Sequence, residues 1–167
     1  MGDSLILSAI ISFIVAILVT GIRSWWDSRK EKVNILKSLL NEIDINLTDA
    51  GNIVTIIRAD VYHPLPIFKN SVWNMGLSKA LNPKEFKITS CAYYKLDLIN
   101  SKIKNREEYN KFWLVGQIPK ENQINTEKAI VFDITNEKNG LIVLLEKARE
   151  EVENIKKKKF SLKPGSI

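Results

Sequence analysis

An arginine and a histidine about one third of the way along the chain are of residue types that can act on a phosphate group. Arg58 and His63 are separated by four residues. A histidine in such a pair serves as general acid or base, and an arginine stabilises the charge that develops on a phosphate. The chain has one histidine and one cysteine and lacks the glycine motifs of nucleotide-binding loops. We therefore expect no cofactor and no metal.

The R-x4-H spacing of Arg58 and His63 resembles the motif of the HEPN ribonucleases, which are helical bundles that act on RNA at a dimer interface. The resemblance covers these two residues and the helical character of the chain. It implies an RNA-acting bundle, or a pore-forming one like small membrane proteins associated with some CRISPR systems. Ala59 stands where the family often has a polar residue. The alternative role for His63 is to cap the carbonyls of a helix end beside a turn.

Glu42 and Asn46 lie four residues apart within an apolar run. They could hydrogen-bond across helices and fix their register, or they could form a solvated pair on one helix face. The run resembles one found in uncharacterised prokaryotic proteins that have a single N-terminal membrane span and a helical bundle. The segment from Tyr94 to Asn100 is similar to a second recurring segment of such proteins. This architectural resemblance implies a fold and no activity.

The N-terminal segment from Leu5 to Ile22 has no ionisable residue. Its length nearly matches a hydrocarbon core of about 30 Å. We therefore predict a transmembrane anchor over residues 1–23, with the lipid bilayer as its surroundings. The alternatives are a buried helix of a soluble protein and a cleaved signal peptide, and the leader lacks the positive charge that a signal peptide requires.

All 25 lysines and arginines follow this segment. The positive-inside rule then predicts a cell-membrane protein with its N-terminus outside and its C-terminal domain in the cytoplasm. Arg23, Trp25 and Trp26 are the expected interface anchors. Small residues recur at every fourth position, which predicts close packing between the membrane helices of several copies. They are Ser8, Ser12, Ala16 and Thr20.

Apolar residues then recur at alternating steps of three and four, as in a coiled-coil heptad seam. They are Val33, Leu36, Leu40, Ile43, Leu47, Ala50, Val54, Ile57 and Val61. This pattern predicts one helix that leaves the membrane and ends at about Ala59, before two prolines. Further helices are expected over 71–81, over 82–104 with Asn82 as its cap, and over 140–159. For 124–139 the pattern does not distinguish helix from strand.

The predicted fold class is therefore all-α, with the transmembrane helix continuing into a cytoplasmic bundle of about four helices over residues 24–159. Residues 160–167 are expected to form a flexible basic tail. The lysines before it, Lys156, Lys157, Lys158 and Lys159, either complement the helix dipole or contact anionic lipid. The net charge of +6 suits anionic lipid and nucleic acid alike.

These patterns favour a non-enzymatic role. We expect a membrane-anchored homo-oligomer that presents its bundle to an unidentified cytoplasmic protein partner. An accessory or effector role in phage defence rests on architectural analogy alone. The first alternative is an HEPN-like RNA-acting or pore-forming bundle that uses Arg58 and His63. The second is a basic lipid-binding or nucleic-acid-binding module, although no aromatic residues interleave with the basic ones in a recognisable motif.

Overall fold

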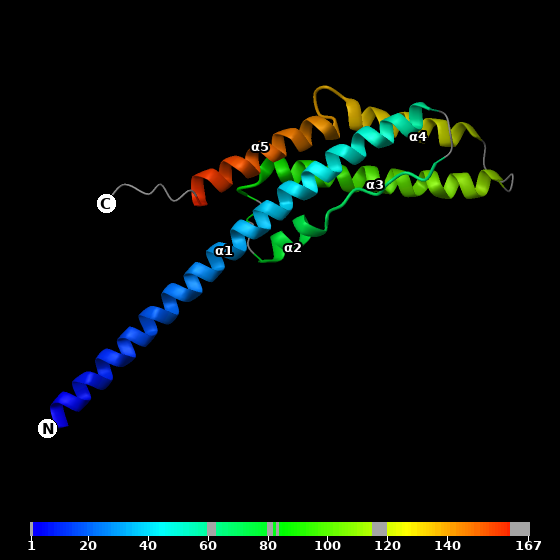
Figure 1. Cartoon of the computed structure of the whole chain (residues 1–167). Helices are drawn as coiled ribbons and strands as arrows, with labels where there is room; N and C mark the ends of the chain where they lie inside the picture. Colours follow the sequence, from blue (N-terminus) through cyan, green and yellow to red (C-terminus); the bar gives the residue numbers. More distant parts are fainter. Residues whose placement is uncertain (1, 60–62, 80–81, 83, 115–119, 161–167) are drawn as a thin grey trace. The chain divides into compact units, whose positions relative to one another are not determined.

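The computed structural model describes residues 2–59, 63–79, 82, 84–114 and 120–160, with side chains for 11–59, 63–76, 82, 84–111 and 121–158. These residues form five α-helices: α1 (Gly2–Arg58), α2 (Ser71–Lys79), α3 (Lys87–Leu114), α4 (Lys120–Thr135) and α5 (Leu141–Phe160) (Figure 1). No strand occurs within the described ranges, so the all-α prediction is confirmed. The stretch 124–139, for which the pattern did not distinguish helix from strand, forms most of α4 and the turn after it.

The chain divides into two compact units, Met1–Asn34 and Ile35–Ile167. The first unit contains the early turns of α1, and the second contains the rest of α1 together with α2 to α5. Within the second unit, α3 packs against both α4 and α5 (Figure 1).

The predicted membrane location is contradicted. Within the residues that the structure describes, no helix has both the length and the apolarity that a membrane crossing requires. A transmembrane helix needs about 20 predominantly apolar residues. A window of that length starting at Ile11, where the described side chains begin, includes Arg23 and Asp27, and such ionisable groups are costly in hydrocarbon. The predicted single-pass topology, with its N-terminus outside and its C-terminal domain cytoplasmic, is therefore contradicted as well.

The core of the second unit is apolar and draws on four helices. Its fully buried residues include Leu39, Ile43 and Ile53 of α1, Leu96, Ile99 and Ile103 of α3, Ile130 and Ile134 of α4, and Leu141, Leu145, Ala148 and Val152 of α5. On α1 four residues of the predicted seam are buried, namely Leu36, Ile43, Ala50 and Val54, but the buried face is rotated slightly from that seam. Leu39 and Asn46 are fully buried, whereas Leu40 and Leu47 of the seam are only partly so. Hydrogen bonds to the segment around α2 hold the side chains of Glu42 and Asn46 in the interior, and this rotates the buried face of α1.

Helix α3 begins at Lys87 and not at Asn82 as the local capping pattern predicted. The Asn82 side chain instead accepts a hydrogen bond from the Lys84 N–H at 3.1 Å, which closes a turn before the helix. The backbone N–H groups of Ile88 and Thr89, which lie in the first turn of α3, donate to the carboxylate of Glu151 in α5 at 3.2 and 2.9 Å. A helix start needs acceptors for its first N–H groups. Here the acceptor comes from a distant part of the sequence.

Candidate functional site

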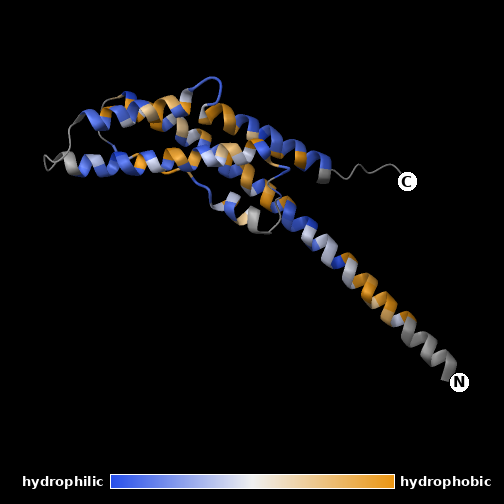
Figure 2. Cartoon of the chain, turned by 180° about the vertical axis from the view of Figure 1, so that it is seen from behind, coloured by the Kyte–Doolittle hydropathy of each residue, from blue (hydrophilic) through white to orange (hydrophobic). Residues whose placement is uncertain are grey.

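The first unit exposes a long apolar surface. Between Ile11 and Trp26, which we call the apolar segment, ten large side chains are at least half exposed: Ile11, Phe13, Ile14, Val15, Ile17, Leu18, Val19, Ile22, Trp25 and Trp26. The segment is largely orange in Figure 2, in contrast to the mixed colours of the bundle helices. Contiguous apolar patches of this kind on a folded chain usually mark interaction sites.

The residues predicted as interface anchors and packing positions lie on this segment. Trp25 and Trp26 have ring centroids 6.1 Å apart, and the Arg29 guanidinium lies 5.3 Å from the Trp25 centroid. Ser12, Ala16, Thr20 and Arg23 are exposed, whereas the side chain of Ser8 lies outside the described residues. The Thr20 hydroxyl donates to the Ala16 carbonyl at 2.7 Å, so it needs no acceptor on another helix.

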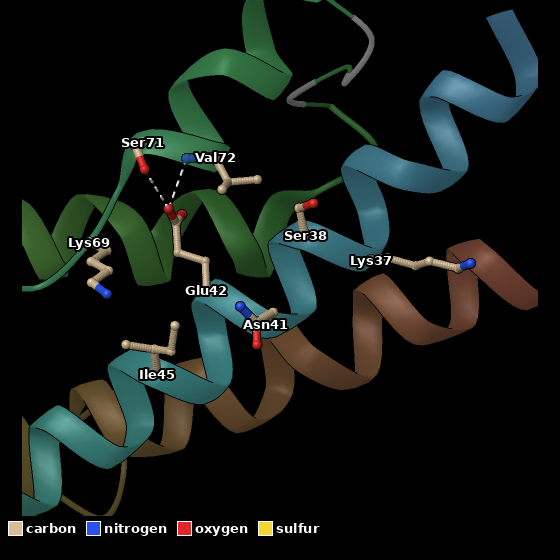
Figure 3. A pocket seen from close by; sticks show the side chains of 8 residues that line it. All are labelled: Lys37, Ser38, Asn41, Glu42, Ile45, Lys69, Ser71 and Val72. Atoms are coloured by element: carbon tan, nitrogen blue, oxygen red, sulfur yellow. Dashed lines mark hydrogen bonds between the residues drawn. The ribbon is translucent and has the colours of Figure 1, made fainter. Parts of the chain in front are cut away.

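Glu42 is the centre of a buried polar site in the second unit. Its side chain points from α1 to the start of α2 (Figure 3). One carboxylate oxygen accepts from the Val72 N–H at 2.8 Å and from the Ser71 hydroxyl at 3.2 Å. The other accepts from the Trp73 N–H at 3.2 Å and from the Tyr93 hydroxyl at 2.8 Å. Glu42 thus provides the acceptors for the first turn of α2, where the helix dipole also favours a negative charge.

Aromatic rings enclose one side of the Glu42 site. Trp73 stacks on Tyr93 with ring centroids 5.2 Å apart, and Phe86 meets Trp73 edge-on at 6.4 Å. Burial raises the pKa of the Tyr93 hydroxyl far above its ordinary value, and the charge of Glu42 and the hydrogen bond to it act in the same direction. Tyr93 therefore keeps its proton and remains a donor to the carboxylate.

A shallow pocket of about 420 Å³ opens beside Glu42. It is lined by Lys37, Ser38, Asn41, Glu42, Ile45, Lys69, Ser71 and Val72 (Figure 3). An ionised carboxylate offers roughly four acceptor positions. Since four donors already occupy them, the Glu42 carboxylate has no acceptor position left for a ligand in the pocket. The arrangement is that of a helix cap and not of a catalytic base.

Asn46 and Asn100 hold the extended segment before α2 from opposite sides. The Asn46 amide accepts from the Lys69 N–H and donates to the Lys69 carbonyl, both at 2.8 Å. The Asn100 amide pairs in the same way with Phe68, at 2.9 and 3.1 Å. Each amide therefore replaces the two hydrogen bonds that a neighbouring strand would make. This explains how buried backbone outside a helix is satisfied.

Arg58 and His63 are both exposed, and the structure does not describe residues 60–62 between them. The carbonyl of His63 accepts a hydrogen bond from the Arg106 guanidinium at 3.1 Å. Arg106 is almost fully buried, and its Nε lies 2.8 Å from the Glu127 carboxylate of α4. The buried arginine of this region is thus Arg106, a residue that the sequence patterns did not single out.

The lysines at the end of α5 lie on a solvated helix end. Lys157 and Lys158 are exposed, and Lys156 is half-buried. The Lys157 ammonium lies 3.9 Å from Glu153, one helical turn earlier. The basic tail was predicted over 160–167, but Phe160 is the last residue of α5. Residues 161–167 and the side chain of Lys159 lie outside the described residues.

Sequence reasoning missed several residues that organise this unit, namely Arg106, Asn100, Glu127 and Glu151. One signal was present for Arg106 and Asn100, because both share a helical face with the apolar residues Leu96, Ile99 and Ile103. A polar residue on an apolar face is buried with a partner or distorts the helix. The partners on α4 and α5 carried no such signal.

Within the described residues, no three acidic, histidine or cysteine side chains gather closely enough to hold a metal ion. Comparison with protein-family models, curated proteins and solved structures found no match. The function must therefore be inferred from the geometry of the two units.

Proposed function

We propose that this chain is a non-enzymatic helical module that associates with copies of itself through the apolar segment and presents its helical bundle to a protein partner. The observation that supports the proposal is the exposure of ten large apolar side chains along a few turns of one helix. A helix that is apolar over most of its circumference is normally buried, and in an isolated chain this one is not.

The size of the surface supports self-association. Ten large side chains, three of them aromatic and each at least half exposed, offer roughly 100 Å² apiece and together on the order of 1,000 Å². A stable protein interface needs about 800 Å² from each partner. At about 25 cal/mol per Å², burial of such a surface favours association by on the order of 20 kcal/mol before entropic costs.

The bundle has the features of a scaffold. Three of its interior polar side chains, Glu42, Asn46 and Asn100, act as caps and clamps, as the saturated carboxylate of Glu42 illustrates. The exposed pair Arg58 and His63 has no described contact that orients either side chain for acid–base chemistry, so we propose no second function.

The test is a comparison of two double variants of the full chain. Val15→Lys with Leu18→Lys adds two charges to the apolar segment, and Thr48→Lys with Asn52→Lys adds the same charges to exposed positions of α1 in the second unit. We expect the first variant to elute as a monomer in size-exclusion chromatography. The second variant should elute with the wild-type assembly, because only the first variant must desolvate charge on association.

Two outcomes would contradict the proposed self-association. If both variants assemble like the wild type, the interface lies elsewhere and the proposal is wrong. The proposal is also wrong if the wild-type chain floats with phosphatidylcholine vesicles and does not associate with itself, because lipid then covers the surface.

A further inference from the structure

The apolar segment has two unequal faces. At 3.6 residues per turn, its ten large side chains occupy about two thirds of the helix circumference, which we call the wide face. The remaining third, the narrow face, carries only small and charged side chains, namely Ser12, Ala16, Thr20 and Arg23, and Asp27 continues it just beyond the segment. The two faces therefore differ in polarity and in side-chain size.

The small residues of the narrow face do not need a partner helix. The Thr20 hydroxyl is bonded within its own helix to the Ala16 carbonyl. Arg23 and Asp27 continue the same face and would have to be desolvated in any contact made there. From Ile11 to Ile22 the wide face contains no charged residue, so burial of this part carries no such cost; the Arg29 guanidinium lies only against its Trp25 end.

We infer that the copies meet through the wide face and leave the narrow face in water. This inference rests on the proposed self-association and reverses the sequence-based prediction, which placed Ser12, Ala16 and Thr20 at the contact. In water the hydrophobic effect drives the association of large apolar side chains, whereas small-residue stripes serve close packing where that drive is missing.

The width of the apolar face also sets a lower limit on the number of copies. The stripe that one helix normally buries against a neighbour spans roughly 100°, whereas the wide face spans about 240°. A pair of helices would leave more than half of the wide face in contact with water. The assembly therefore contains at least three copies of this chain.

Disulfide crosslinking tests which face is buried. Cys91 is the one cysteine of the chain and is exposed, so Cys91→Ser gives a background without thiols. Leu18→Cys then places a thiol on the wide face, and Ala16→Cys places one on the opposite side of the helix. Both positions lie near the middle of the apolar segment, so each can meet its own copy whether the helices run parallel or antiparallel.

We expect Leu18→Cys to form intermolecular disulfides on the order of tenfold faster than Ala16→Cys, because bridging requires Cα atoms within about 7 Å. Equal rates, a faster reaction at position 16, or no crosslink at either position in an assembled protein would overturn the inference and leave the proposed function intact. A monomeric mass for both variants and for their Cys91→Ser parent would instead remove the proposed function itself, and the inference with it.

Discussion

Replacing Glu42 by alanine is expected to lower the free energy of unfolding by about 3–5 kcal/mol. The substitution leaves the N–H groups of Val72 and Trp73 and the Tyr93 hydroxyl without an acceptor in a buried site. Each orphaned buried donor costs about 1–3 kcal/mol, and the start of α2 loses its cap as well. Denaturant unfolding followed by circular dichroism measures the loss.

The matched control is Asp44→Ala, two residues further along α1. Asp44 is half exposed and pairs with Arg149 at 3.0 Å, and exposed ion pairs contribute about 0–1 kcal/mol. If the two alanine variants lost similar amounts of stability, the Glu42 carboxylate would not be the buried cap described above. Glu42→Gln should fall between the two, because its NH₂ group would face the donors on α2.

The second large effect concerns Arg106. Arg106→Met is expected to cost about 3 kcal/mol, since it leaves the Glu127 carboxylate partly buried without its cation and removes a donor from the His63 carbonyl. The fall should appear as a lower denaturant midpoint with an unchanged slope.

A double-mutant cycle separates the ion pair from the rest of the contacts. Combining Arg106→Met with Glu127→Met removes both charges of this pair and should recover part of the lost stability, because the partly buried carboxylate at position 127 is gone; the contact of Arg106 with Glu107 is lost in both variants and cancels in the cycle. Strictly additive losses would show that the two side chains do not act as a pair, and the description of this site would then be incorrect.

The helical character of the chain follows from local patterns in the sequence. The three–four spacing from Val33 onward predicts the long helix, and the prolines after His63 predict its end near Ala59, as observed at Arg58. The prediction and the structure agree here because interactions between adjacent turns of the same chain segment determine where this helix forms and ends.

The start of α3 and the face of α1 could not be predicted, because distant residues determine them. Glu151 caps α3 from another helix, and a local pattern around Asn82 cannot report it. For Glu42 and Asn46 the sequence left two roles open, and the backbone groups they bind lie on a segment more than twenty residues away. The hydrophobic pattern alone therefore placed the seam on Leu40 and Leu47.

The role of the N-terminal segment was the main error of the sequence interpretation. The apolar composition from Leu5 to Ile22 predicted a membrane span, whereas the described part of the helix is too short in apolar residues to cross a membrane. The composition does establish an apolar surface, and its burial away from water is favourable. We propose that copies of the same chain bury this surface.

Sedimentation equilibrium of the full-length chain in detergent-free buffer tests this central claim most directly. With a subunit mass of 19.1 kDa, self-association through the wide face predicts an average mass of at least three subunits that falls on dilution. A single species of 19.1 kDa across the whole concentration range would contradict the account.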